Sequence, residues 1–291
     1  MKRHALGLLA TLLGAALPFA AVRSAAPSLP AESRVPGGIA LIELGSTAAE
    51  PGQVFFNGHR TPVVRSGEIW TAVVGIPLDI VPGPQAARFV RADGQGTRDL
   101  AFEVTPKLYA EQRLTVQDQR QVDPNEADLE RIDREQARID RALSIFSSDL
   151  TPPWQMTTPV PGRRSSSFGL RRFFNGQSRK PHSGMDIAAP TGTPIVNPAA
   201  GRVVEAGDFF FNGNTVFVDH GLGVVTMYCH LSRIDVKPGE TIAAGRQLGL
   251  VGATGRVTGP HLHWGIGVNR AMVDPVLFLP PEAQAPPAAG R

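Results

Sequence analysis

The chain has 291 residues, enough for about two domains. Its 29 Lys and Arg residues exceed its 26 Asp and Glu residues by three, and three basic residues (Lys2, Arg3 and Arg23) precede position 27. The remaining chain therefore has 26 residues of each sign, so its charge gives no support for binding to nucleic acid. The single cysteine, Cys229, excludes an internal disulfide and a cysteine-based metal site.

The first 26 residues have the pattern of an export signal. Lys2 and Arg3 give a positively charged start, an apolar run spans residues 6–21, and small residues near Ala26 provide a cleavage site. The run is shorter than the ~20 residues of a spanning helix, so we expect cleavage rather than an uncleaved membrane anchor. The signal predicts a periplasmic or secreted protein with no stable membrane span after its removal.

Short apolar runs separated by turn residues fill residues 27–110. Runs at this spacing are typical of strands in a small β-sandwich. Asn57-Gly58 is a tight-turn pair between two of them. We therefore expect a β-rich, sandwich-like amino-terminal domain. Its expected strands are residues 39–44, 53–56, 69–74, 88–90 and 100–104.

Residues 111–160 are expected to form a helical linker. Apolar residues recur there at helical spacing over 124–146, with Asp, Glu and Arg between them. Pro124 is suited to a first helical turn and Asp123 to its cap. We expect one amphipathic helix whose charges form a solvated face; the alternative is a helix that binds a partner or autoinhibits a groove.

Residues 161–280 return to short strands and turns, and residues 281–291 form a Pro/Ala-rich tail that is expected to be disordered. The short apolar runs and turns of residues 27–110 and 161–280 predict a mainly β protein with two β-rich domains. The clearest strands of the second domain are residues 201–206, 215–219, 224–230, 247–251 and 262–268.

Histidines cluster in the second domain. His261 and His263 are two apart on an expected strand, so their side chains point to the same face. His182 and Asp186 are four apart, and Gly184 between them lets another backbone approach closely. With one member of the His261/His263 pair, they make a set of two histidines and one aspartate. Three such ligands plus a water are the arrangement of a catalytic zinc site.

Hydrolysis by such a site also needs a base and support for the developing oxyanion. The His-Glu-x-x-His pattern is absent, so the usual glutamate base is missing. His230 and the other member of the His261/His263 pair can fill that role, because histidine transfers protons near neutral pH. His220, which follows Asp219 at a strand end, is expected to serve a turn and packing instead.

Three ordered motifs resemble the signatures of lysostaphin-like (LytM-type) zinc endopeptidases. They are His182-x-x-x-Asp186, Met227-Tyr228-Cys229-His230-Leu231 and Gly259-Pro260-His261-Leu262-His263-Trp264, and the flank from Ala253 through Arg256 to Gly259 matches too. The resemblance covers about residues 160–280. The preceding section more loosely resembles the β-rich domain often found ahead of this peptidase domain in Gram-negative bacteria.

The resemblance implies a role for each residue of the cluster. His182, Asp186 and His263 correspond to the zinc ligands. His230 and His261 correspond to the catalytic pair that orients or deprotonates the water and supports the tetrahedral intermediate. The resemblance also implies an antiparallel-β peptidase domain with Zn²⁺ at the floor of a groove. The implied activity is zinc-dependent endopeptidase cleavage of cross-links or stem peptides in bacterial peptidoglycan.

Two features depart from the family pattern. Cys229 replaces a residue that is usually Ala, which changes little because both are small and buried. Some relatives have a Tyr just before the first ligand to stabilise the oxyanion, whereas residues 175–181 contain none. Basic residues near the first ligand either meet acidic stem peptides or form a solvated loop. These residues are Arg171, Arg172, Arg179 and Lys180.

Three other functions compete with this interpretation. A catalytically silent relative would bind the cell wall or activate another wall hydrolase, but it would have lost ligands that this sequence keeps. A carrier domain is suggested by residues 236–252, which resemble lipoyl and sugar-phosphotransferase barrels, but such carriers lack the histidine motifs. A secreted peptidase that acts on proteins would have the same active site.

Overall fold

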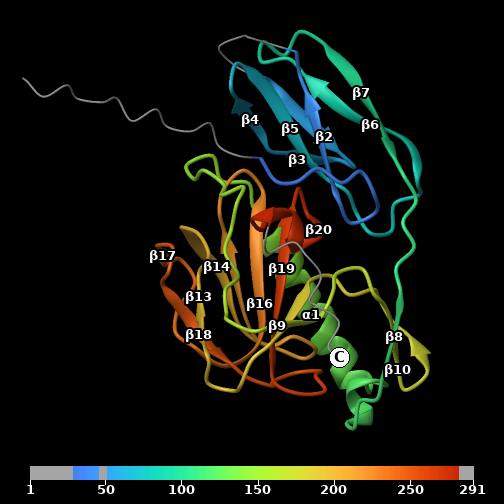
Figure 1. Cartoon of the computed structure of the whole chain (residues 1–291), viewed down its shortest axis with the longest axis vertical. Coiled ribbons are helices and arrows are strands. Elements are labelled where there is room, and N and C mark those ends of the chain that lie inside the picture. The colour runs from blue at the N-terminus through green and yellow to red at the C-terminus, as the bar shows by residue number, and fades with distance from the viewer. Residues whose placement is uncertain (1–28, 46–50, 282–291) are drawn as a thin grey trace, which may run out of the picture.

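The computed structural model describes residues 29–45 and 51–281. They form two β-rich bodies, with one helix lying along the second body (Figure 1). The expected export signal (residues 1–26) and nearly all of the expected tail (residues 282–291) lie outside the described residues. Within the described part, no helix has the length and apolar character needed to cross a membrane.

The amino-terminal body is built from two sheets that share one core. Buried residues such as Ile42 and Val74 of one sheet pack with Phe56 and Phe102 of the other, which confirms the expected sandwich-like arrangement. One sheet has the order β1 (Ile39–Glu43), β5 (Ile69–Gly75), β4 (Val63–Ser66). The other has the order β3 (His59–Thr61), β2 (Gln53–Phe56), β6 (Gly83–Val90), β7 (Thr97–Val104).

The second body is a ten-stranded sheet whose strands pair antiparallel. Its main path is β17 (Thr241–Ile242), β14 (Gly201–Phe209), β15 (Gly213–Asp219), β16 (Val224–Ile234), β19 (His261–Val268), β12 (Met185–Ala188), β9 (Arg163–Ser166). Off this path, β13 (Pro194–Val196) pairs with β18 (Gln247–Val251), and β20 (Ala271–Val273) pairs with β19. Tyr228 and Trp264 face each other across β16 and β19 and are fully buried in the core on one side of this sheet.

The helix α1 (Glu126–Leu143) begins later than the sequence predicted. Asn125 is its cap: the Asn125 side chain accepts a hydrogen bond from the Asp128 amide, and the Asp128 side chain accepts one from the Asn125 amide. The prediction of Asp123 as the cap was wrong, because this reciprocal capping box satisfies two amides that a helix leaves free.

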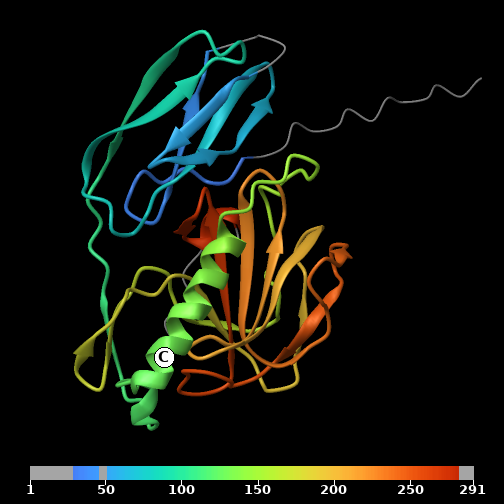
Figure 2. The ribbon, with the colours of Figure 1, turned by 180° about the vertical axis from the view of Figure 1, so that it is seen from behind.

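The helix α1 lies along the large sheet (Figure 2). Part of its charged surface packs against that sheet. Arg131 bonds Asp208 at 2.8 Å, and Arg138 bonds Glu205 at 2.8 Å. The buried Glu135 accepts a 2.7 Å hydrogen bond from the Phe210 amide. The expected solvated face is present at exposed charges such as Glu130 and Arg134. The expectation was wrong for Arg131, Glu135 and Arg138, which pair with polar groups along β14 and the turn that follows it.

Segments of the expected linker are packed into the second body. The strand β8 (Glu111–Leu114) runs parallel to β10 (Arg171–Phe174), which also pairs with β11 (Gln177–Ser178). Farther along, Trp154, Met156 and Val160 are buried in the core of the large sheet. Residues on both sides of α1 thus contribute to the second body, while the domain boundaries themselves stay predictions.

A candidate metal centre and its groove

The three predicted ligands come from two paired strands and one loop. Asp186 on β12 lies opposite His263 on β19 in the antiparallel register. His182 precedes β12, and two backbone hydrogen bonds hold it in place. Its amide donates to the Leu170 carbonyl, and its carbonyl accepts from the Gly169 amide. All three side chains are buried. The sheet register therefore fixes two of the ligands, and a backbone clamp fixes the third.

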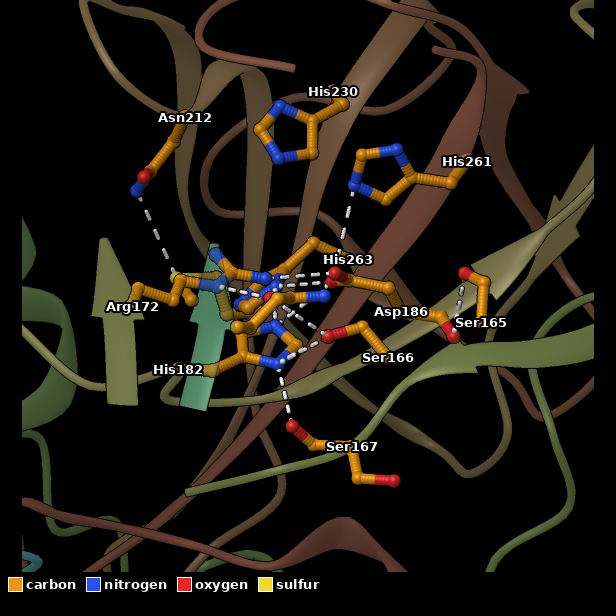
Figure 3. Close-up of polar contacts among 12 residues, drawn as sticks. Ser165, Ser166, Ser167, Arg172, His182, Asp186, Asn212, His230, His261 and His263 are labelled. Atoms are coloured by element: carbon orange, nitrogen blue, oxygen red, sulfur yellow. Dashed lines mark hydrogen bonds and ion pairs between the residues drawn. The ribbon is translucent and has the colours of Figure 1, made fainter. Parts of the chain in front are cut away.

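The donor atoms of these three residues converge on one point (Figure 3). Asp186 Oδ1 lies 2.9 Å from His182 Nε2 and 2.9 Å from His263 Nδ1, and the two nitrogens are 3.0 Å apart. The His182 Nδ1–H donates a 2.7 Å hydrogen bond to the Ser167 carbonyl, which can only accept. His182 Nε2 therefore carries a lone pair aimed at the shared point, as a metal ligand requires.

Electrostatics keep this cluster in its ligand form. Burial lowers the pKa of His182 and of His263 and outweighs the opposing effect of Asp186. Burial alone would raise the pKa of Asp186, but its hydrogen bonds with His182 and His263 hold that pKa well below its usual range. At neutral pH the site therefore presents two neutral imidazoles and one carboxylate, and these are the protonation states that bind metals.

Arg172 fixes the second oxygen of the aspartate. Its Nη2 bonds Asp186 Oδ2 at 2.8 Å, which leaves Oδ1 for the shared point. Arg172 Nε in turn bonds Gln112 Oε1 at 3.2 Å, from the neighbouring strand β8. Arg172 thus belongs to the site rather than to a solvated loop, whereas Arg171 beside it is exposed and pairs with Glu111.

His230 reaches the cluster through a break in strand pairing. Between the pairs Val216–Tyr228 and Asn214–Leu231, β15 has one residue and β16 has two. His230 is the second of these two and has a φ of 68°, in the left-handed region. Such a bulge redirects a side chain. As a result, His230 does not follow Tyr228 into the core, and its ring lies 6.1 Å from that of His263.

His230 and His261 form a pair beside the ligand cluster (Figure 3). Their ring centres are 4.8 Å apart. His230 Nδ1 bonds the Thr254 carbonyl and His261 Nδ1 bonds the Gly259 carbonyl, both at 2.8 Å. Each Nδ1 must therefore carry the proton, which leaves Nε2 as an acceptor in the neutral ring. Burial, and then the charges of His261 and His263, keep the pKa of His230 well below its usual value.

A cavity of about 300 Å³ lies over this pair and the aspartate. His230, His261 and Asp186 line it together with Arg172, Arg256 and residues of the segment 112–116. The structure therefore brings the five predicted site residues together, and three of them line the groove, while their roles stay predictions. The sequence assigned no role to Gln112 or Arg256; Arg256 lies inside a matching motif, and this was the only signal for it.

Other residues discussed from the sequence lie away from the groove. His220 is fully buried, bonds the Ala200 carbonyl and the Thr226 hydroxyl at 2.8 Å, and takes no part in the metal cluster. Cys229 is buried, and burial raises the pKa of its thiol to about 12. Both therefore have the packing roles that the sequence predicted.

Comparison with known sequences places both bodies in one family. The profile of Peptidase family M23 matches residues 180–275, and that of the Peptidase family M23 N-terminal domain matches residues 32–107. A crystal structure titled as a putative peptidase M23 from Pseudomonas aeruginosa is 44% identical, with a TM-score of 0.72. The match covers 85% of this chain and 95% of that one.

Curated relatives match over the second body. The peptidoglycan DD-endopeptidase ShyA of Vibrio cholerae is 41% identical over 126 residues, 43% of this chain and 29% of that protein. The DD-carboxypeptidase/endopeptidase Mpg of Neisseria meningitidis is 41% identical over 130 residues, 44% of this chain and 30% of that protein. The matched region thus spans less than a third of these relatives. On the two profiles and the Pseudomonas structure, the chain belongs to peptidase family M23.

Proposed function

We propose that this protein is a zinc-dependent endopeptidase that hydrolyses peptide cross-links or stem peptides of bacterial peptidoglycan. The observation that carries the proposal is the convergence of His182 Nε2, Asp186 Oδ1 and His263 Nδ1 beside the paired imidazoles of His230 and His261. The names of two relatives from Vibrio cholerae, the peptidoglycan DD-endopeptidases ShyA and ShyC, support peptidoglycan as the substrate class. The export signal expected from the sequence supports a periplasmic or secreted location.

The ligand set fits zinc in chemistry and in spacing. Two imidazole nitrogens and one carboxylate oxygen are common ligands of catalytic zinc. Ligand atoms about 2.0–2.1 Å from a tetrahedral zinc lie roughly 3.3 Å from one another. The three donor atoms here are 2.9–3.0 Å apart, so a small outward movement of the side chains would accommodate the ion. When bound, zinc would supply Lewis acidity and a water that ionises near neutral pH.

The residues of the chain then perform the proton transfers. His230 and His261 both line the groove, and in the neutral ring each has an unprotonated Nε2, so either can accept a proton from the attacking water. The imidazolium formed can donate that proton to the amine of the leaving peptide. While protonated, it can also stabilise negative charge on the carbonyl oxygen, which agrees with the absence of a tyrosine before His182. Arg172 holds the aspartate fixed while these charges change.

Digestion of intact peptidoglycan by the purified full chain tests the proposal. We expect cross-linked muropeptides to decrease with zinc present and to persist after chelation. His261→Ala should reduce the rate by about 10²–10⁴-fold, because it removes one of the two proton acceptors. His59→Ala, on β3 of the other body, serves as the control and should cleave normally.

Cleavage that persists in His261→Ala and after chelation would contradict the proposed chemistry. A zinc-loaded protein that cuts no cross-link, but increases cleavage by another wall hydrolase, would instead support the catalytically silent alternative.

A further inference from the structure

Arg256 is a cation held inside the groove by aromatic rings. Its guanidinium carbon lies 4.1 Å from the ring centre of Phe211 and 4.6 Å from that of Phe174. Stacking of this kind fixes the plane of the guanidinium while its N–H edge remains open to other partners. The residue lines the same cavity as His230 and His261.

Arg256 has no anionic partner among the described residues. Its side chain makes one long hydrogen bond, from Nη1 to the Gln121 carbonyl at 3.4 Å, although a guanidinium has five N–H donors. No carboxylate of residues 29–45 or 51–281 forms an ion pair with it. Burial, followed by the charges of Arg172 and Arg179, lowers the pKa of Arg256 to about 10, so the group stays charged at neutral pH.

Arg172, the other arginine that lines the cavity, provides an internal comparison. It is also largely buried, but it is paired with Asp186 Oδ2 and bonded to Gln112. Its charge is therefore already neutralised within the chain. A desolvated cation without a counter-ion is unfavourable unless a ligand supplies the opposite charge. In this groove, Arg256 is the cation that meets that description.

We propose that Arg256 binds a carboxylate of the substrate next to the peptide bond that is cut. This inference rests on the proposed function of the same groove. A planar guanidinium matches a carboxylate in a bidentate geometry. The proposal therefore makes Arg256 a specificity-determining residue: it selects among cross-links by the charge beside the scissile amide.

The chemistry of cross-links indicates which carboxylate this is. When the amine of the cross-link comes from a diamino dicarboxylic acid, the carbon that bears the scissile nitrogen also bears a free carboxylate. When the amine comes from a lysine side chain, that carbon bears no carboxylate. Arg256 would favour the first kind of cross-link, since only there does an anion lie within two bonds of the leaving nitrogen.

A matched pair of substrates tests this selection. The two cross-linked peptides are identical, except that the carboxylate beside the scissile nitrogen is free in one and a carboxamide in the other. We expect the unaltered full chain to cut the carboxylate form with a kcat/KM about 10- to 100-fold higher, as for loss of a hydrogen bond to a charged group. Arg256→Gln should reduce this ratio to near one, and Arg256→Lys should give an intermediate ratio.

The control variant is Arg171→Gln, which removes the same charge from β10 at an exposed position paired with Glu111. It should keep the full preference for the carboxylate. An unaltered protein that cuts both peptides equally would overturn the proposal. So would an Arg256→Gln variant that lowers both rates by the same factor, because the residue would then act only on the fold of the groove.

Binding of the cleavage product separates this inference from the proposed function. The product peptide ends in the diamino acid, again with a carboxylate or a carboxamide, and its affinity is measured calorimetrically on the full chain. Tighter binding of the carboxylate form, lost in Arg256→Gln, supports the subsite even if no cross-link is cut, and in that case only the proposed function fails. Equal affinity for the two products overturns the subsite.

Discussion

Gly184 lies directly behind the ring of His263, and its missing side chain sets the position of that ligand. A Cβ at residue 184 would lie 2.7 Å from His263 Cε1 and Nε2 and 2.6 Å from the Trp264 carbonyl oxygen. The carbonyl belongs to the central strand β19 and cannot move away easily. The imidazole would have to shift instead, and with it one corner of the ligand cluster.

Gly184→Ala is therefore expected to weaken zinc binding by about 10- to 100-fold, the usual effect of disturbing a group that orients a ligand. Competition with a chromogenic chelator measures the affinity. Gly259→Ala is the matched control, because a Cβ at residue 259 meets no atom within 4 Å. Equal zinc affinities for the two variants would show that His263 is not positioned by Gly184.

His220 makes the stability of the protein depend on pH. Burial lowers its folded-state pKa from 6.5 to about 4. As the pH falls below 6.5, the unfolded chain binds a proton that the folded chain excludes, so the free energy of unfolding decreases until about pH 4. The decrease reaches about 3 kcal/mol for a shift of this size.

His220→Gln should remove this component. Urea unfolding at pH 7 and pH 5 gives the free energy of unfolding for each protein, and we expect a smaller loss on acidification in the variant. The metal-ligand histidines titrate in both proteins, so the difference between the two losses isolates His220. Identical losses in both proteins would contradict a neutral, buried His220.

The sequence predicts the identity of the candidate site residues better than their orientation. The spacing of His261 and His263 places both on one face of a strand, and the structure agrees. The same alternation would send His230 into the core with Tyr228, and only the bulge reverses it. A bulge depends on pairing with a distant strand, so no local pattern could predict it. The sequence left the role of Arg172 open for a similar reason, because Arg172 and its partner Asp186 come into contact only in the folded chain.

At the scale of elements, α1 is attached to the sheet by charges as well as by apolar residues. Ala142, Ile139 and Leu143 pack with Phe209 and Phe217. Arg131 and Arg138 form the ion pairs with residues of β14 that are described above. The helix pattern was strong enough to predict its existence, but the partners of its charges lie more than 60 residues away in the sequence.

Loss of the capping box should weaken this element measurably. Asn125→Ala leaves the Asp128 amide without its acceptor and is expected to lower stability by about 1 kcal/mol, or roughly 2–4 °C in Tm. Asp123→Ala is the control, because Asp123 does not cap the helix. Thermal unfolding followed by circular dichroism compares the two. A larger loss of stability in Asp123→Ala than in Asn125→Ala would instead support Asp123 as the cap, as the sequence had suggested.

The strand β8 was not predicted because its sequence, Glu-Gln-Arg-Leu, has no apolar run. It forms because β10 offers a pairing edge, and this pairing brings Gln112 to Arg172. The segment before α1 thereby becomes one wall of the groove. Strands with a clear apolar run, such as β1 and β5, were predicted with ends that differ by no more than one residue from those observed.

At the scale of the whole molecule, the two bodies are joined by buried contacts. The Asn269 side chain accepts a 2.6 Å hydrogen bond from the Gly75 amide and donates a 3.1 Å bond to the Gly75 carbonyl. Ile39 and Val73 of the amino-terminal body belong to the core cluster of the large sheet. β5 and β19, which are distant in the sequence, thus form part of one continuous interior.

Asn269→Ala should loosen this junction. It leaves both polar groups of Gly75 buried without partners, at about 1–3 kcal/mol each. We expect faster hydrogen exchange at the Gly75 amide. Asn269 has a φ of 42°, so Asn269→Gly provides a control that removes the side chain without backbone strain. If Asn269→Gly exchanges as slowly as the unaltered protein, the side chain does not hold the bodies together.

The central claim is that His182, Asp186 and His263 bind one zinc ion, and elemental analysis of the purified full chain tests it most directly. We expect about one zinc per chain in the unaltered protein and in His59→Ala. Alanine in place of any one of the three ligands should leave less than about a tenth of that amount. Full zinc content in the ligand variants, or a protein that takes up no zinc when it is supplied in excess, would contradict the account.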